Sequence, residues 1–209
     1  MSKDIELLKQ KFESNIDDED SLENYVKELA ELVYRFQDEN KIESLSLLIQ
    51  LFEELMKKHA TNKFLQINYG QTIVNSLPLF FAESTPIESI KIINNLRSHA
   101  YNTNSKLLIE FLAMTLTNAI YDFSLIRKIS SIREFGMELI DLSRKYPKEE
   151  KIQTVCAKGL MNATMFFLQN NDREATSNYY QTLIKIINNH PGKDMVDTML
   201  LLKLKEYFE

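Results

Sequence analysis

The sequence predicts an all-α protein in which about four to five helix pairs stack into a solenoid. Two observations carry this prediction. A segment of similar sequence recurs along the chain, and apolar residues recur at the three- and four-residue spacing of helices that are buried on one side. A third observation excludes an all-β fold. The 209 residues include only 4 glycines and 4 prolines, whereas many short strands would need more turn residues.

The recurring segment is clearest in the middle of the chain. Its three gapless copies are Tyr69 to Phe80 (YGQTIVNSLPLF), Leu112 to Phe123 (LAMTLTNAIYDF) and Cys156 to Phe167 (CAKGLMNATMFF). Each copy has an asparagine at the same place, and Asn75, Asn118 and Asn162 follow one another at intervals of 43 and 44 residues. Steps of 44 and 41 reach Glu31 and Lys203 in two degenerate terminal copies. End repeats are expected to differ, because they face water where an inner repeat faces a neighbour.

Each copy predicts an inner helix, such as the one from Lys106 to Phe123. Apolar residues cover most of the circumference of that helix, so it must be packed on several sides. They are Leu107, Leu108, Phe111, Leu112, Leu116, Ala119, Ile120 and Phe123. Stacked helix pairs meet this requirement, since each inner helix then contacts its own outer helix and both adjacent pairs.

The stretches between the copies predict the outer helices. Each opens with a tetrad that resembles a capping box, in which the first side chain accepts a hydrogen bond from the first helical turn and a glutamate three residues later accepts one in return. The four tetrads begin at Asn40, Thr85, Ser131 and Asn171. The first outer helix is expected from Asn40 to about His59, with Leu45, Leu48, Phe52 and Leu55 as its apolar stripe. Short turns at 59–62, 99–102, 146–147 and 190–192 lead to the next inner helices.

We expect a single domain over residues 1–209. Its parts are an N-terminal capping helix and acidic linker at 1–20, a degenerate first inner helix at 21–39, and helix-pair repeats at 40–83, 84–127, 128–169 and 170–209. The capping helix is expected at 3–14. Asp20 and Glu23 form a further candidate capping box at the end of the acidic linker.

The composition indicates which classes of partner and which cell compartment to expect. The formal net charge is -5 and the pI about 5.4, which argues against a nucleic-acid partner because such proteins usually carry a large basic face. No apolar run reaches the ~20 residues that span a bilayer, and the charged start of the chain has no signal-peptide core. A single cysteine, Cys156, fits a reducing compartment. We therefore expect a cytoplasmic protein with no membrane partner.

The period, the two-helix unit and the inner-helix strings IVNSL, LTNAI and LMNAT resemble armadillo/HEAT-type repeats over residues 21–209. The resemblance implies a right-handed α-solenoid, an alpha-alpha superhelix, whose inner helices line a concave binding face. It also implies that the repeated asparagine can clamp the backbone of an extended peptide. The unit has no clear short first helix, so HEAT-like and TPR-like relatives stay open as alternatives to armadillo.

These observations indicate a non-enzymatic module for protein–protein interaction that binds a protein or peptide partner. A primary amide both donates and accepts hydrogen bonds, and the ~8–10 Å between packed helices matches about three residues of extended chain. The candidate peptide-binding residues are Asn75, Asn118, Asn162, Gln71, Met114, Lys158 and Phe111. Two alternatives remain. The asparagines can instead lock adjacent repeats together, or the solenoid can form a homo-oligomer through its ends or its apolar flank.

No pattern in the sequence predicts an enzyme. Phosphate-binding loops and dinucleotide fingerprints are absent from it. The histidines, His59, His99 and His190, fall in separate repeats, which makes them poor partners in one metal site. Cys156 occupies a predicted core position with no histidine near it in sequence. We therefore expect no catalytic residue, no metal and no cofactor.

Overall fold

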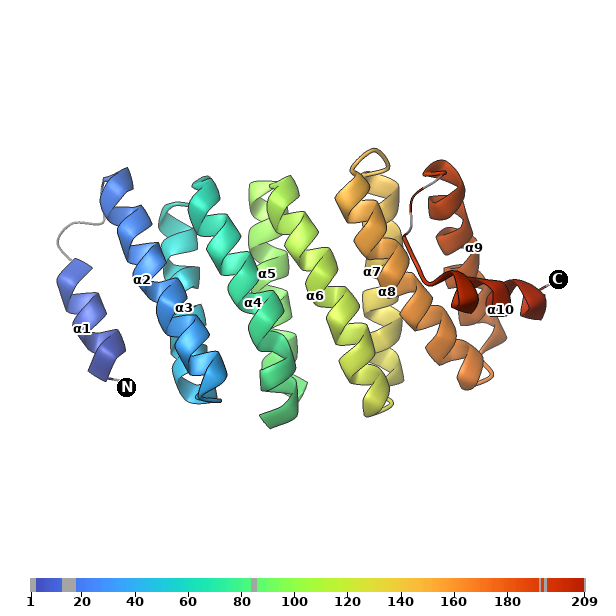
Figure 1. Ribbon diagram of the computed structural model, residues 1–209, viewed down its shortest axis with the longest axis horizontal. Helices are drawn as coiled ribbons and strands as arrows, with labels where there is room; N and C mark the ends of the chain where they lie inside the picture. Colours follow the sequence, from blue (N-terminus) through green and yellow to red (C-terminus); the bar gives the residue numbers. More distant parts are fainter. Residues whose placement is uncertain (1–2, 13–17, 84–85, 192, 194, 209) are drawn as a thin grey trace. The chain divides into compact units, whose positions relative to one another are not determined.

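The computed structural model describes residues 3–12, 18–83, 86–191, 193 and 195–208, and this part of the chain forms ten α-helices and no strand (Figure 1). The helices are α1 (Lys3–Phe12), α2 (Glu19–Asp38), α3 (Ile42–Lys58), α4 (Lys63–Glu83), α5 (Pro86–Thr103), α6 (Lys106–Leu125), α7 (Ile129–Lys145), α8 (Glu150–Gln169), α9 (Arg173–Asn189) and α10 (Thr198–Phe208). The predicted all-α class is confirmed.

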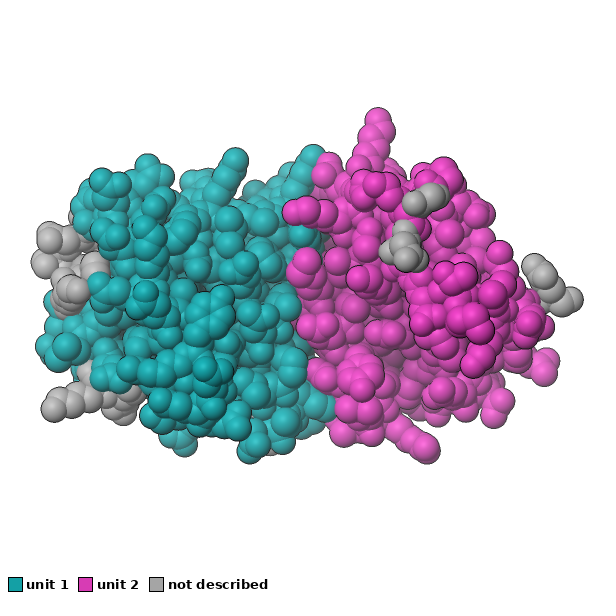
Figure 2. Space-filling model, in the orientation of Figure 1, with its two compact units in different colours: residues 1–112 teal, residues 113–209 magenta. Residues whose placement is uncertain are grey.

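The chain divides into two compact units, Met1–Leu112 and Ala113–Glu209, called unit 1 and unit 2 below (Figure 2). The division falls inside α6, so the first residues of this helix belong to unit 1 and the rest to unit 2. Each unit is described by itself.

Unit 1 has two layers of helices. The inner helices α2 and α4 pack on one another, and Figure 1 shows them in front of the outer helices α3 and α5. Helix α4 contacts α2, α3 and α5, which explains why it buries residues around most of its circumference. The outer helix α3 buries the predicted stripe of Leu45, Leu48, Phe52 and Leu55. Each such side chain contributes about 1.5–3 kcal/mol when it leaves water.

Unit 2 repeats the two layers with α6 and α8 as inner helices and α7 and α9 as outer helices. A close approach joins α6 to α8. The Thr117 hydroxyl donates a hydrogen bond to the Val155 carbonyl over 3.2 Å, and Gly159 lies beside it. A Cβ atom on Gly159 would stand only 2.5 Å from Thr117 Oγ1, so the absence of a side chain at Gly159 permits this contact.

Three inner helices end in the same kind of turn. Asn40, Arg127 and Asn171 have left-handed φ angles of 51°, 53° and 57°. In each turn, the N–H of the next residue bonds to the carbonyl five residues before it, at 2.9 to 3.0 Å, and the left-handed residue bonds to the carbonyl three before it. This pattern is the Schellman motif, which satisfies the last carbonyls of a helix.

The predicted capping boxes at Asn40 and Asn171 are wrong for a physical reason. Asparagine tolerates left-handed φ better than most residues, and here it ends the preceding inner helix instead of starting the outer one. Helix α3 follows Lys41 without a side-chain cap, and α9 is capped by Asp172, which accepts a hydrogen bond from the Ala175 N–H at 3.1 Å.

Two further predicted boxes also differ from the structure. Ser131 is buried inside α7, which begins two residues earlier at Ile129. Helix α2 begins at Glu19 and is capped by Asp18, not by Asp20; the Ser21 N–H donates to Asp18 Oδ1 at 2.8 Å. The box expected at Thr85 lies outside the described residues.

The predicted turn at 99–102 is helical in the structure. Helix α5 continues to Thr103 and is followed by Asn104, whose φ angle of 49° turns the chain. The predicted turns at 59–62 and 146–147 begin where the structure ends a helix. Helix α3 ends just before His59, and α7 ends just before Tyr146. Residues 13–14 of the predicted capping helix and Gly192 lie outside the described residues.

Buried glutamines tie two inner helices to the turns that precede them. The Gln153 amide of α8 donates to the carbonyls of Ser143 and Tyr146, at 2.8 and 2.9 Å. The Gln66 amide of α4 donates to the Ala60 carbonyl at 2.6 Å. The Ser143 carbonyl lies in the last turn of α7, where carbonyls lack a partner within the helix, so Gln153 supplies one.

Helix α10 differs from the other helices that follow an outer helix. Figure 1 shows it lying across α9 and not alongside it. Among its residues only Leu204 is buried, and Phe208 stacks on Tyr180 of α9 with ring centroids 4.3 Å apart. Lys203, the expected last member of the asparagine series, is exposed.

Candidate functional site

One side of each inner helix stays exposed or half-buried. Residues at i, i+4, i+7 and i+11 lie on the same side of a helix, and in all four inner helices the members of such a set are exposed or half-buried. The sets are Lys27, Glu31, Tyr34 and Asp38 on α2; Gln71, Asn75, Pro78 and Ala82 on α4; Met114, Asn118, Tyr121 and Leu125 on α6; and Lys158, Asn162, Met165 and Gln169 on α8. We call this side the free face of each inner helix.

Six of the seven candidate binding residues lie on these free faces. The exposed ones are Gln71, Asn75 and Lys158, and the half-buried ones are Met114, Asn118 and Asn162.

Phe111 is placed differently. It is only 9% exposed, and its ring packs against Gly70 of α4 in unit 1. The ring therefore belongs to the core of unit 1 and leaves little surface for a ligand.

The three repeated asparagines stand apart from other asparagines in the described part of the chain. Within the described residues, the side-chain amides of Asn75, Asn118 and Asn162 make no hydrogen bond to the protein. Other asparagines behave differently: the Asn68 amide donates to the Phe64 carbonyl at 2.8 Å, for example. The alternative in which the repeated asparagines lock adjacent repeats requires such bonds, so it loses its support in the described part of the chain.

In unit 1 the asparagine series borders only a shallow hollow. Asn75 shares it with Gln71 and Asn68 of α4 and with Tyr34 of α2. Its volume is about 10 Å³, which holds at most one water molecule. The amides there lie at a surface and not in a pocket.

In unit 2 the asparagine series borders a larger cavity of about 530 Å³. This volume lies in the range of about 300–1,000 Å³ that is usual for ligand pockets. The lining residues come from α6, α8, the turn after each, and the start of α10: Tyr121, Ser124, Leu125, Arg127, Asn162, Met165, Phe166, Gln169, Asn170 and Leu200. We call it the α6–α8 cavity.

The α6–α8 cavity combines apolar and polar surface. Phe166 is nearly buried and provides an apolar wall, while Asn162 and Gln169 contribute amides. Among the described residues that line it, Arg127 carries the only charge, and no carboxylate is present. This sign is opposite to that of the whole chain, whose formal net charge is -5.

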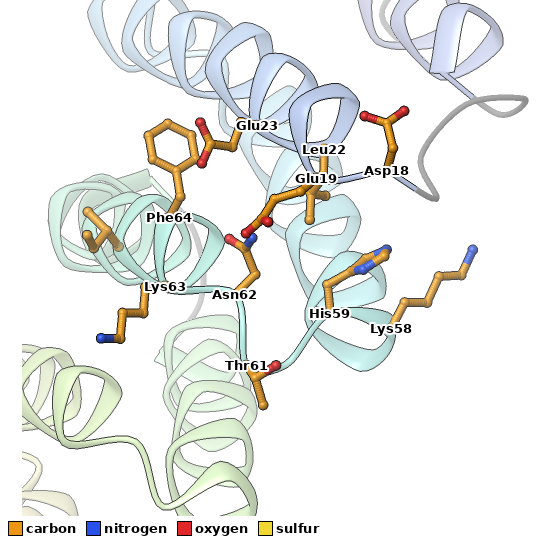
Figure 3. Close-up of a pocket in the computed structure, with 11 residues that line it drawn as sticks. Asp18, Glu19, Leu22, Glu23, Lys58, His59, Thr61, Asn62, Lys63 and Phe64 are labelled. Carbon is orange, nitrogen blue, oxygen red and sulfur yellow. The ribbon is translucent and has the colours of Figure 1, made fainter.

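Two hollows in unit 1 have mixed charge. The first, of about 720 Å³, lies between the start of α2 and the α3–α4 turn, and Figure 3 shows Asp18 and Glu19 above the turn that carries Asn62. Two of its polar groups already cap helices: Asp18 caps α2, and Asn62 accepts a hydrogen bond from the Leu65 N–H at 2.8 Å. The second, of about 710 Å³ between α1 and α2, contains an ion pair between Asp4 and Arg35. Neither hollow includes a repeated asparagine.

Burial shifts the pKa of several titratable groups in the described part of the chain. Burial raises the pKa of Glu53, although a hydrogen bond from Asn95 partly opposes the shift, and burial lowers the pKa of His99. His99 packs edge-on against Tyr69, with ring centroids 5.5 Å apart. Burial also raises the pKa of the Cys156 thiol to about 12. Among the described residues, no group of three His, Cys, Asp or Glu side chains is placed to hold a metal ion.

Comparison of the chain with protein-family models, with curated proteins and with solved structures gave no match. In the part of the chain that the structure describes, no helix combines the length and the apolar character needed to cross a bilayer.

The sequence analysis named Met114 but missed four other aromatic or apolar members of the free faces, Tyr34, Tyr121, Leu125 and Met165. Tyr34, Tyr121 and Leu125 are all more than half exposed, and Met165 is half-buried. The signal was present in the sequence, since Tyr121 and Met165 each follow a repeated asparagine by three residues, which places them on the same side of the helix. The sequence analysis did not extend the asparagine series along this face of the helix.

Proposed function

We propose that the protein is a non-enzymatic interaction module that binds an extended peptide segment of a partner protein on the free faces of its inner helices. One observation carries the proposal. The repeated asparagines lie on these faces, and within the described residues their amides have no hydrogen-bond partner in the protein. A side-chain amide can engage the N–H and the C=O of a peptide backbone together.

The α6–α8 cavity adds to this support. Asn162 stands at its edge and Asn118 lies on the free face of the adjacent helix α6, so two repeated amides occur in one unit. Leu125 and Met165 offer apolar contact beside them, and methionine adapts to differently shaped side chains. The arrangement suits backbone binding by the amides and insertion of one partner side chain into the cavity.

The same proposal includes an armadillo/HEAT-type solenoid with a period of about 44 residues. The left-handed residues Arg127 and Asn171 are 44 positions apart, and Asn40 precedes Arg127 by 87, close to two such periods. The buried glutamines Gln66 and Gln153 are also 87 positions apart. We include the right-handed superhelix and a cytoplasmic compartment in the proposal, the latter on the basis of the single cysteine.

The test is a selection of random dodecapeptides displayed on phage against the purified chain. The affinity of the best peptide is then measured by fluorescence polarisation for the wild type and for Asn118→Ala with Asn162→Ala. We expect the double variant to lose at least about tenfold in affinity, because each missing amide leaves a peptide backbone group unbound. Its melting temperature should stay near that of the wild type, since the amides have no bonds within the described protein.

The matched control replaces two exposed asparagines at the end of the outer helix α9, Asn188→Ala with Asn189→Ala. This variant should bind the peptide as tightly as the wild type does. Failure of the library to give any binder, or equal affinity in the Asn118/Asn162 variant, would overturn the proposal.

A second candidate function is self-association, and α10 is the feature that favours it. Its Met199, Leu202 and Tyr207 side chains are about half or more exposed although the helix is mostly apolar. Sedimentation velocity at two protein concentrations distinguishes the candidates. A rise in sedimentation coefficient with concentration that Leu202→Ser removes supports self-association, and a constant monomer argues against it.

A further inference from the structure

Arg127 occupies a backbone position that its residue type does not explain. Of the three described turns with this geometry, two use asparagine, at Asn40 and Asn171, and the third uses Arg127 at a φ angle of 53°. Asparagine is several-fold enriched in left-handed conformations because its short polar side chain bonds locally, whereas arginine has no such preference. Residues that contradict a local preference tend to occur where function requires them.

The surroundings of Arg127 supply a reason. Its side chain lines the α6–α8 cavity, where the other described lining residues are uncharged. Within the described residues, its guanidinium makes no ion pair or side-chain hydrogen bond. The adjacent cation, Lys128, is engaged over the ring of Phe123 at 5.7 Å. Among the described residues, the cavity therefore presents one unpaired positive charge beside an apolar wall formed by Phe166.

We propose that the α6–α8 cavity selects peptide segments in which a large apolar side chain lies next to a carboxylate. The apolar side chain contacts Leu125, Met165 and Phe166, and the carboxylate pairs with Arg127. This inference rests on the proposed function, because it specifies the partner of the same surface.

The chemistry of the lining residues favours a carboxylate over other anions. Guanidinium and carboxylate groups form two parallel hydrogen bonds, and the pair is stronger where apolar surface limits water. Phosphorylated peptides are usually bound by clusters of arginines, and nucleic acid requires many cations. The cavity offers a single arginine, in a chain of net charge -5. The absence of a carboxylate among the described lining residues leaves the guanidinium available to the ligand.

The key variant is Arg127→Asn. Asparagine already occupies the equivalent turns at Asn40 and Asn171, so the substitution removes the charge while it keeps a residue suited to left-handed φ. Its melting temperature should equal or exceed that of the wild type. A loss of peptide binding in this variant then reports on the charge and not on the fold.

Random dodecapeptides displayed on phage are selected against the wild type and against Arg127→Asn. We expect the wild type to enrich Asp or Glu within two positions of a large apolar residue, and Arg127→Asn to enrich the apolar residue without the acid. The best peptide and its version with the acid changed to the amide are then titrated against both proteins by fluorescence polarisation. Either change alone should weaken binding at least about tenfold, and the two together should weaken it little more than one.

The possible outcomes separate this inference from the proposed function. Wild-type binders without an acidic preference overturn the inference and leave the interaction module in place. So does a finding that Arg127→Asn weakens the amide peptide by the same factor as it weakens the acid peptide. Enrichment of phosphomimetic acid pairs without an apolar residue also overturns it. A library that gives no binder at all overturns both.

Discussion

Gly159→Ala tests the close approach between α6 and α8. In an exposed helix interior, glycine to alanine stabilises a protein by about 1 kcal/mol because alanine restricts the unfolded chain and favours the helix. Here the new methyl group would stand 2.5 Å from Thr117 Oγ1 and would also overlap Leu139 Cδ1. The substitution is therefore expected to destabilise unit 2, whereas glycine to alanine in a helix usually stabilises a protein.

The magnitude follows from three terms. Overpacking of a filled site costs about 1–3 kcal/mol. Displacement of the Thr117 hydroxyl breaks its bond to the Val155 carbonyl, which costs about 1 kcal/mol more. Alanine has a higher helix propensity than glycine, which offsets about 1 kcal/mol of this loss. The net loss is about 2 kcal/mol, or about 4–8 °C in melting temperature for a chain of this size.

Urea unfolding and thermal melting, followed by circular dichroism, measure this loss. Lys158→Ala is the control, because it changes the neighbouring exposed residue of the same helix and should stay within about 0.5 kcal/mol of the wild type. In a Thr117→Ala background one of the two obstacles is gone and only Leu139 Cδ1, at 2.3 Å from the new Cβ, remains, so Gly159→Ala should then cost about 1 kcal/mol less than in the wild type.

Two results would refute the reasoning. The first is an increase in stability for Gly159→Ala in the wild-type background. The second is the same loss in both backgrounds, which would show that Thr117 does not limit the space at Gly159.

Three further predictions concern buried groups. Asp122→Asn should stabilise the protein by about 1 kcal/mol near pH 7, because burial raises the pKa of Asp122 and one carboxylate oxygen has no partner among the described residues. A raised pKa means that the folded state binds the proton more tightly, so the advantage of the variant should shrink as pH falls through that pKa. The same difference in free energy of unfolding between variant and wild type at about pH 7 and about pH 4, measured by urea unfolding, would contradict the prediction. Tyr69→Phe should leave stability unchanged or raise it by up to about 1 kcal/mol in thermal melting, since the buried phenol has no hydrogen-bond partner in the described chain, and a clear loss would reveal one. Cys156 is buried with its pKa raised to about 12, so Ellman's reagent should react with it at least about 100-fold faster in denaturant than in the native protein, and rapid native labelling would show local opening of α8.

The sequence was sufficient for the fold class and for most helix bodies. Long amphipathic or largely apolar segments leave little choice of secondary structure, and the stripe of Leu45, Leu48, Phe52 and Leu55 is buried as expected. Helix ends were harder to predict. Asn40 and Asn171 suit both the start of a helix and the left-handed residue after one, and only the structure distinguishes the two roles.

The candidate site was partly accessible to sequence reasoning. Periodicity identified Asn75, Asn118 and Asn162, because a repeat of this length is visible without coordinates. It did not identify Arg127, which lies in a turn outside the inner-helix copies and lines the cavity only when α6 and α8 are packed. Nor did it place Phe111 in the core, since that depends on the space beside Gly70 in another helix. Contacts between helices far apart in sequence account for these differences.

The free faces of α4 and α6 carry no charged residue: Gln71, Asn75, Pro78 and Ala82 on one, and Met114, Asn118, Tyr121 and Leu125 on the other. A neutral surface does not attract a partner over long range, so encounters there should proceed at about 10⁵–10⁷ M⁻¹s⁻¹ and depend little on ionic strength. Differences in affinity among partners would then reside in how slowly each complex dissociates. The acidic residues that give the chain its net charge of -5 lie on faces other than these two neutral stripes.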